Sequence, residues 1–149
     1  MSITAGNSSG VNDGGAALVI VDDSIAAESL ATVKAWASVG VAPARTGLAP
    51  TLAIAKALDR AGLDIADVAL WEINEAFASM CVGTTKLLGI DEEIVNVEGS
   101  GCSLGHPVAM TGSRMVISLV HELRRRDGGI GVAAMCAGGG MATAVVVEV

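Results

Sequence analysis

Aromatic side chains are scarce in this sequence, whose 149 residues include one Phe, two Trp and no Tyr. Surfaces that bind single-stranded nucleic acid usually stack bases on aromatic rings, so this scarcity argues against such a surface. Basic residues are also few, and the formal net charge of −7 repels a phosphate backbone. The composition therefore predicts no nucleic-acid partner.

Long apolar runs are missing as well. Hydrophobic residues make up 52% of the chain, yet no run approaches the roughly 18–20 residues that cross a bilayer. Short apolar runs are typical of strands that are covered on both faces. The N-terminus also lacks the basic and then apolar pattern of a secretory signal. We therefore expect a cytoplasmic protein with no membrane partner.

The cysteines are three in number, Cys81, Cys102 and Cys136, and an odd count suits a reduced compartment. Their spacing matches no zinc-binding pattern, so we expect no metal site. Cys81 falls on the apolar side of a predicted helix, and both it and Cys102 are interpreted as packing residues.

Strand-like and helix-like segments alternate along the chain. Strands are predicted at 16–21, 32–41, 67–73, 94–99, 129–136 and 142–149. Helices are predicted at 50–62, 74–89 and 107–126, and residues 22–29 as a polar connection or short helix. This alternation indicates an α/β fold with a mainly parallel sheet, to which a C-terminal hairpin adds an antiparallel strand.

Three polar residues stand at turns between these elements: Asn74, His106 and Cys136. Ligands of open α/β sheets bind beyond the carboxyl ends of the strands, so the three can converge on one edge. Each also has a structural interpretation. Asn74 suits a helix N-cap, His106 a satisfied or surface residue at a helix start, and Cys136 a buried strand position.

The chemical interpretation of the same residues is more specific. Asn74 can orient a water or donate to an oxyanion. The helix start favours a neutral His106, which can act as a base or donate to an enolate oxygen. Cys136 can transfer a proton if its pKa is suitable, and the glycines at 138–140 let a substrate approach the backbone.

Two further features have weaker functional interpretations. The run Arg124-Arg125-Arg126 suits the C-terminal end of a helix, although it could also anchor an anionic ligand. The segment TAGNSSG, residues 4–10, suggests phosphate binding but lacks the spacing and the Lys of a P-loop.

Taken together, four segments resemble signatures of the thiolases. NEAFA at 74–78, GHP at 105–107 and CAGGG at 136–140 resemble the three C-terminal motifs, in that order. TAGNSSGVNDGGAA at 4–17 resembles the segment that closes the thiolase N-terminal domain. The resemblance implies 1–22 as the incomplete end of that domain and 23–149 as the C-terminal domain. It also implies a thiolase-like half with a five-stranded mixed sheet and helices on both faces.

The resemblance implies a role for each matched residue. Cys136 corresponds to the cysteine that moves the proton at the α-carbon, and His106 to the histidine that activates the nucleophilic cysteine. Asn74 corresponds to the asparagine that holds a water in the oxyanion hole, and Gly138 to the glycine whose N–H binds the thioester oxygen. Ser9 corresponds to a serine near the pantetheine arm of coenzyme A, which is here a substrate.

The family's nucleophilic cysteine belongs to a segment that this sequence does not match, since neither Cys81 nor Cys102 lies in its motif. Covalent catalysis needs the nucleophile as well as its base. We therefore expect acyl transfer between acyl-CoA and CoA in fatty acid metabolism, with little activity from this chain alone. The expected partner is a second copy or a chain that carries the N-terminal half. The alternative is a non-catalytic module that binds acyl-CoA or another protein.

One segment departs from the family pattern. Many thiolases have a Gly-x-Gly-Pro stretch beside the substrate, where this chain has ARTGLAPTLA at 44–53. Arg45 and Leu48 therefore leave the acyl-chain preference open. A third possibility, a related condensing or sterol-carrier-type protein, ranks low because such proteins usually replace Asn74 or Cys136.

Overall fold

The computed structural model describes residues 2–25 and 29–149 of the chain. The strands are β1 (Thr32–Gly40), β2 (Val68–Ile73), β3 (Ile130–Ala137) and β4 (Met141–Glu148). The α-helices are α1 (Ala49–Ala61), α2 (Ala78–Leu88) and α3 (Val108–Arg125). Short 3-10 helices lie at η1 (Ala5–Asn7), η2 (Pro43–Leu48), η3 (Ile65–Asp67) and η4 (Glu92–Ile94). None of the helices within these residues combines the length and hydropathy needed to cross a membrane.

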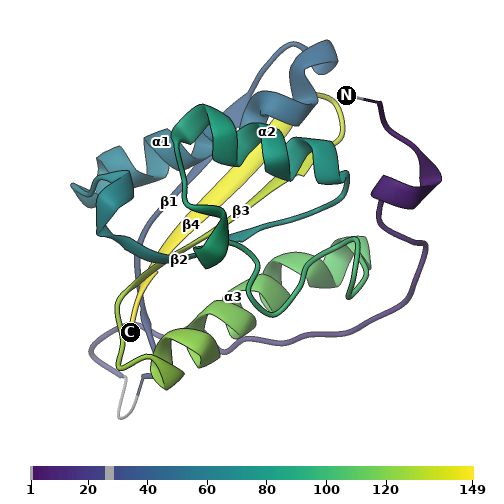
Figure 1. Cartoon of the computed structure of the whole chain (residues 1–149). Helices are drawn as coiled ribbons and strands as arrows, with labels where there is room; N and C mark the ends of the chain where they lie inside the picture. The colour runs from purple at the N-terminus through teal and green to yellow at the C-terminus, as the bar shows by residue number, and fades with distance from the viewer. Residues whose placement is uncertain (1, 26–28) are drawn as a thin grey trace.

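The strands form one mixed sheet in the order β1-β4-β3-β2. β2 and β3 run parallel, whereas β4 is antiparallel to both of its neighbours, β3 and β1. Figure 1 shows α1 and α2 on one face of the sheet and α3 on the other. The α/β class, the mixed sheet, the C-terminal hairpin and the helices on both faces are confirmed. The expectation of a mainly parallel sheet is wrong, because two of the three strand pairs in the described sheet are antiparallel. The prediction of five strands is wrong, because the described residues form a sheet of four.

Each face of the sheet has its own apolar core. Under α1 the core includes Ala53, Ile54, Leu58, Trp71, Val132 and Ala134. Under α3 it includes Leu70, Met115, Leu119, Leu123, Ala133 and Val147. Neighbouring residues of β3 enter opposite cores, as the two-residue period of a strand requires. This two-sided burial accounts for the high hydrophobic content noted in the sequence.

The strand predicted at 94–99 is not part of the sheet. Among the described residues it pairs through a single bridge, between Val95 and Trp71 of β2. Asn96 and Gly99 then adopt left-handed backbone angles, with φ of 52° and 91°, which bend the chain away from the sheet. An apolar run of this length cannot continue a ladder through two such bends, so the segment ends as a turn.

The strand predicted at 16–21 is also wrong. These residues are irregular, and Leu18, Val19, Ile20 and Val21 are exposed. A strand needs a neighbour to satisfy its backbone groups, and the described sheet provides none here. The short helix considered for 22–29 is only a turn as far as Ile25, and residues 26–28 lie outside the described residues.

Candidate active site

The site begins at the carboxyl end of two parallel neighbours, β2 and β3. Ile73 pairs with Ala134, and the N–H of Asn74 donates to the Ala134 carbonyl at 2.9 Å. Cys136 lies two residues further along β3, which is about 7 Å at the rise of a strand. Asn74 and Cys136 therefore share one edge of the sheet, as expected for open α/β proteins.

Asn74 follows directly after β2 and is positioned by the end of that strand, not by a helix. Helix α2 begins only at Ala78, so the alternative interpretation of Asn74 as its N-cap is wrong. The side chain of Asn96 brackets the preceding residue, accepting from the Ile73 N–H at 2.8 Å and donating to its carbonyl at 2.9 Å. Asn96 thus takes the place of a neighbouring strand at the end of β2. Asn74 itself is fully buried.

His106 lies two residues before α3, where several elements hold it. Its N–H donates to Asn12 Oδ1 at 3.0 Å, and its Nδ1 is 2.7 Å from Thr111 Oγ1. Asn74 Nδ2 lies 3.4 Å from each ring nitrogen. The structure therefore brings Asn74 and His106 together, as the sequence predicted for this edge.

The Thr111 contact selects one form of the imidazole. Thr111 Oγ1 lies 3.2 Å from the Pro107 carbonyl oxygen and 2.7 Å from His106 Nδ1, and its single hydrogen can serve only one of them. We assign that hydrogen to Pro107, so that toward His106 the hydroxyl accepts. Nδ1 then carries the proton, and Nε2 keeps a lone pair. Burial, and then the charge of Arg114, lower the pKa of His106, which keeps the imidazole neutral at pH 7. This is the form of histidine that can accept a proton.

Replacing Thr111 with valine is expected to destabilise the protein by about 1 kcal/mol and to release the Nδ1 proton preference of His106, because a buried hydrogen bond is lost. Urea unfolding measures the first effect, and ¹⁵N chemical shifts of the imidazole measure the second. Thr111→Ser is the matched control, since it keeps the hydroxyl. An unchanged tautomer in Thr111→Val would contradict this assignment.

Cys136 reaches the same edge without joining that cluster. By the alternation of β3, in which Ala134 enters the α1 core and Met135 the α3 core, Cys136 belongs to the α1 face. No hydrogen bond in the described part of the chain links its thiol to Asn74 or His106. Burial raises the pKa of the half-buried Cys136 thiol, so it is protonated at neutral pH. A protonated thiol suits a proton donor better than a nucleophile.

The glycines after Cys136 form the turn between β3 and β4. Gly139 and Gly140 have φ of 85° and 89°, and the Gly140 carbonyl accepts from Val41 N at 2.7 Å. Gly138 has an ordinary φ, is exposed, and has open space where a Cβ would lie. The turn is therefore fixed at one end and accessible at Gly138.

The N-terminal segment crosses both motif-bearing loops. Ser9 N–H donates to the Ala76 carbonyl at 3.0 Å, and Ser8 forms a bridge with Phe77. Further along, Asn12 holds the backbone of His106. Ser9 is thus near the NEAFA loop. Asn12, Asn96 and Thr111 are site residues that sequence reasoning missed, and only the position of Asn12 inside TAGNSSGVND offered a signal.

The remaining sequence candidates have structural roles. Cys81 is buried, which raises its pKa to about 12, and the packing interpretation is confirmed. Cys102 is exposed, with its N–H donating to Glu75 Oε2 at 3.2 Å, so its packing interpretation is wrong. Arg125 and Arg126 pair with Glu122 at the end of α3, which favours the helix-end interpretation of the basic run.

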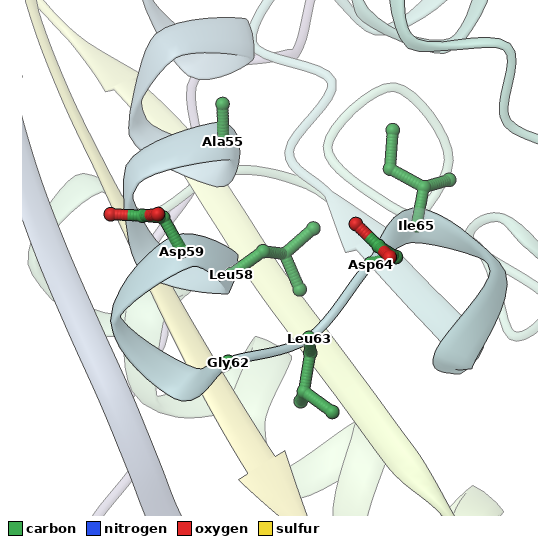
Figure 2. A pocket seen from close by; sticks show the side chains of 7 residues that line it. All are labelled: Ala55, Leu58, Asp59, Gly62, Leu63, Asp64 and Ile65. Atoms are coloured by element: carbon green, nitrogen blue, oxygen red, sulfur yellow. The ribbon is translucent and has the colours of Figure 1, made fainter.

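Two surface hollows lie outside this cluster. One, of about 390 Å³, lies at the C-terminal end of α1 and is lined by aliphatic side chains with Asp59 and Asp64 (Figure 2). Ile65, which also lines it, comes just before β2, so this hollow is at the opposite edge of the sheet from Asn74. The other, of about 200 Å³, is an apolar groove between α3 and the β3–β4 hairpin, with Leu18 at its side.

Known proteins resemble this chain along nearly its whole length. Residues 27–149 match the family model described as the C-terminal domain of thiolase. Acetyl-CoA acetyltransferase of Escherichia coli K12 is 47% identical over 99% of this chain and 38% of its own length. 3-Ketoacyl-CoA thiolase of Bacillus subtilis 168 is 45% identical over 99% of this chain and 39% of its own length.

Solved structures give the same result. The crystal structure of Bacillus anthracis acetyl-CoA acetyltransferase superposes with a TM-score of 0.95 and 44% identity, over 99% of this chain and 38% of that one. Human mitochondrial 3-ketoacyl-CoA thiolase gives 0.90 and 36%, over 98% of this chain and 38% of that one. This chain thus spans well under half the length of these relatives, and it belongs to the thiolase family.

Proposed function

We propose that this chain supplies the proton-transfer side of a thiolase active site, for acyl transfer between acyl-CoA and CoA. The observation that carries the proposal is the neutral His106, held by Thr111 and lying beside the buried Asn74 at the sheet edge that also bears CAGGG. A neutral imidazole with a free nitrogen is suited to take a proton from a thiol. The names of the E. coli and B. subtilis relatives support this class of reaction.

In the proposed reaction, His106 removes the proton from a nucleophilic thiol, which attacks the keto carbonyl of 3-ketoacyl-CoA. The bond between the α- and β-carbons breaks, and the thiol of Cys136 gives its proton to the α-carbon of the leaving acetyl-CoA, which leaves the acyl group on the nucleophilic sulfur. The thiol of CoA then gives its proton to the Cys136 thiolate and attacks this thioester. The shortened acyl-CoA leaves, and the freed thiolate takes its proton back from His106. Asn74 holds a water toward one developing oxyanion, and the N–H of Gly138 donates to the thioester oxygen. Ser9 contacts the pantetheine arm. Reversal of these steps gives condensation.

The nucleophilic thiol is proposed to come from an N-terminal thiolase half, in the same protein or in a second chain. Residues 1–22 would then belong to that half and 23–149 to the C-terminal domain. Fatty acid metabolism in the cytoplasm is the proposed setting. Two relatives are named as peroxisomal and mitochondrial thiolases, so the compartment differs among members of the family. Cell fractionation measures it for this chain.

A second candidate function is a non-catalytic module that binds acyl-CoA. It is favoured by one observation: burial, as the largest cause, raises the pKa of Cys81, Cys102 and Cys136. Each thiol is therefore protonated at neutral pH, and none is poised to attack a carbonyl.

A domain exchange tests the first proposal. The matched region of the E. coli acetyltransferase is replaced by this chain, and thiolysis of acetoacetyl-CoA is compared with that of the chain alone. The proposal expects activity in the chimera and none in the chain alone. An inactive but folded chimera that still binds CoA by calorimetry would favour the binding module. Full turnover by the chain alone would show that no second half is needed.

The isolated chain is expected to self-associate. Leu18 lines the apolar groove beside α3, and the side chains of Val19, Ile20 and Val21 that follow it are exposed. Exposed apolar side chains in such a run favour association. Sedimentation velocity measures the effect. Val19→Glu with Ile20→Glu should reduce association, whereas a clean monomer of the unchanged chain would contradict the expectation.

A further inference from the structure

An ion pair buried under α3 connects the two elements that carry the site. Glu72 on β2 and Arg114 on α3 approach at 2.5 Å between Oε2 and Nη1, and their side chains are 4% and 15% exposed. Glu72 lies two residues before Asn74, and Arg114 lies three residues after Thr111, which holds His106. The pair therefore fixes the start of α3 against the end of β2.

Stability alone does not account for such a pair. Removing two charges from water costs more than their attraction returns in many proteins, and apolar replacements are often neutral or stabilising. Here burial raises the pKa of Glu72 to about 7 against the opposing pull of Arg114, so the carboxyl is poorly solvated. Arg114 Nη2 is also buried without a hydrogen-bond partner in the described part of the chain.

The charge of Arg114 acts on His106. After burial, it is the second cause that lowers the pKa of His106. Around the pair, Glu75 after β2 and Glu98 before α3 add negative charge that raises the pKa of Glu72. The other titratable groups on elements around the imidazole are Asp13 beside Asn12, Cys102 in the loop before His106, and Cys136 on β3. Arg114 follows Thr111 by three residues on α3, so both side chains lie on one face of the helix, and Thr111 contacts the imidazole. The mostly buried guanidinium is therefore placed on the side of α3 that faces His106.

We propose that Arg114 is a positioning residue for His106: Glu72 holds its guanidinium in place, and the guanidinium sets a permanent positive charge near the imidazole at the head of α3. This inference rests on the proposed role of His106 as the base. A proton taken up by the imidazole then meets an unfavourable field, so it is passed on rather than kept. The ion pair with Glu72 keeps the Arg114 side chain from turning to solvent.

The chain's two histidines make a direct test possible, because His121 lies on the exposed face of α3 and serves as an internal reference. We would record the NMR titration of both imidazoles in the full chain, assigned with His121→Gln. Arg114→Gln is expected to raise the His106 midpoint relative to His121. Arg114→Lys, which keeps the charge, is expected to leave it nearer to the starting value.

Glu72→Gln is the matched control for loosened packing. It keeps an acceptor for Arg114, and removing a negative charge near an imidazole would lower and not raise its midpoint, so Glu72→Gln should not raise the His106 midpoint. A rise in Arg114→Gln alone supports the proposal. A rise in both variants would mean loss of packing, and no rise in Arg114→Gln would mean no charge effect; either result overturns it.

Two controls distinguish a change in the His106 midpoint from unfolding of a variant and from failure of the proposed function. Far-UV circular dichroism confirms that each variant is folded, and if Arg114→Gln does not fold, Arg114→Met supplies the neutral side chain with similar length. Because the titration needs no substrate, an inactive chimera in the domain-exchange experiment would leave it readable. A shifted midpoint without thiolase activity would refute the proposed function, and activity with an unshifted midpoint would refute this inference.

Discussion

Replacing His106 with alanine in the domain-exchange chimera is expected to lower kcat/KM for acetoacetyl-CoA thiolysis by about 10²–10⁴-fold, the usual contribution of a positioned acid or base. The reason is that Nε2 of the neutral ring is the proton acceptor that the site offers beside Asn74. Because burial and Arg114 lower the pKa of His106, the unchanged chimera should keep its activity as the pH falls until the pH passes below that lowered pKa, where the imidazole takes up a proton.

The matched control for this experiment is His121→Gln, which should leave kcat/KM unchanged because His121 is exposed on α3. Cys136→Ala and Cys102→Ala form a second pair, in which only the first should reduce activity. If His106→Ala kept more than a tenth of the activity of the chimera, the base would have to be sought elsewhere.

Replacing Gly140 with alanine is expected to destabilise the protein by about 2–5 kcal/mol. The φ of 89° costs a residue with a Cβ about 1–2 kcal/mol, and overpacking adds about 1–3 kcal/mol. The overpacking arises because the new Cβ would lie 2.2 Å from the Val41 carbonyl oxygen, a backbone atom that cannot turn aside. Urea unfolding followed by circular dichroism measures the loss, which is a large part of the stability of a typical domain.

Substitutions of the two preceding glycines are controls that separate backbone strain from overpacking. Gly139 has φ of 85° but open space around its Cβ position, so Gly139→Ala should cost only the backbone strain of about 1–2 kcal/mol. Gly138 has neither problem, and Gly138→Ala should change stability by less than about 0.5 kcal/mol. Equal losses at all three positions would mean that the turn is not fixed by its contact with Val41.

The sequence predicts the elements whose pattern is local. The helix at 107–126 and the C-terminal hairpin lie within a few residues of their predicted bounds, because periodicity and turn glycines act over short distances. The meeting of Asn74 and His106 is anticipated only in part: Asn74 follows β2, as the rule about the carboxyl ends of strands requires, whereas the segment 94–99 before His106 is not a strand. Cys136 reaches that edge, but its contacts depend on which face of β3 it occupies, and no motif carries that information.

What the sequence does not predict depends on partners distant along the chain. The segment 94–99 has a strand's composition, yet Asn96 turns its own side chain to Ile73 and replaces the ladder. The run at 16–21 has the composition of a strand and lacks a neighbour among the described residues. Thr111 and Asn12 become site residues only through contacts with His106 that no local pattern specifies.

The N-terminal segment has a consequence for the order of folding. Its bond from Asn12 to the His106 backbone joins residues 94 positions apart, and closing so long a loop costs entropy before any contact repays it. The β3–β4 hairpin and the helices rest on local contacts and can form first. The hydrogen bond that fixes the His106 backbone therefore forms late in folding. It is lost whenever the N-terminal segment detaches, even if the rest of the fold stays intact.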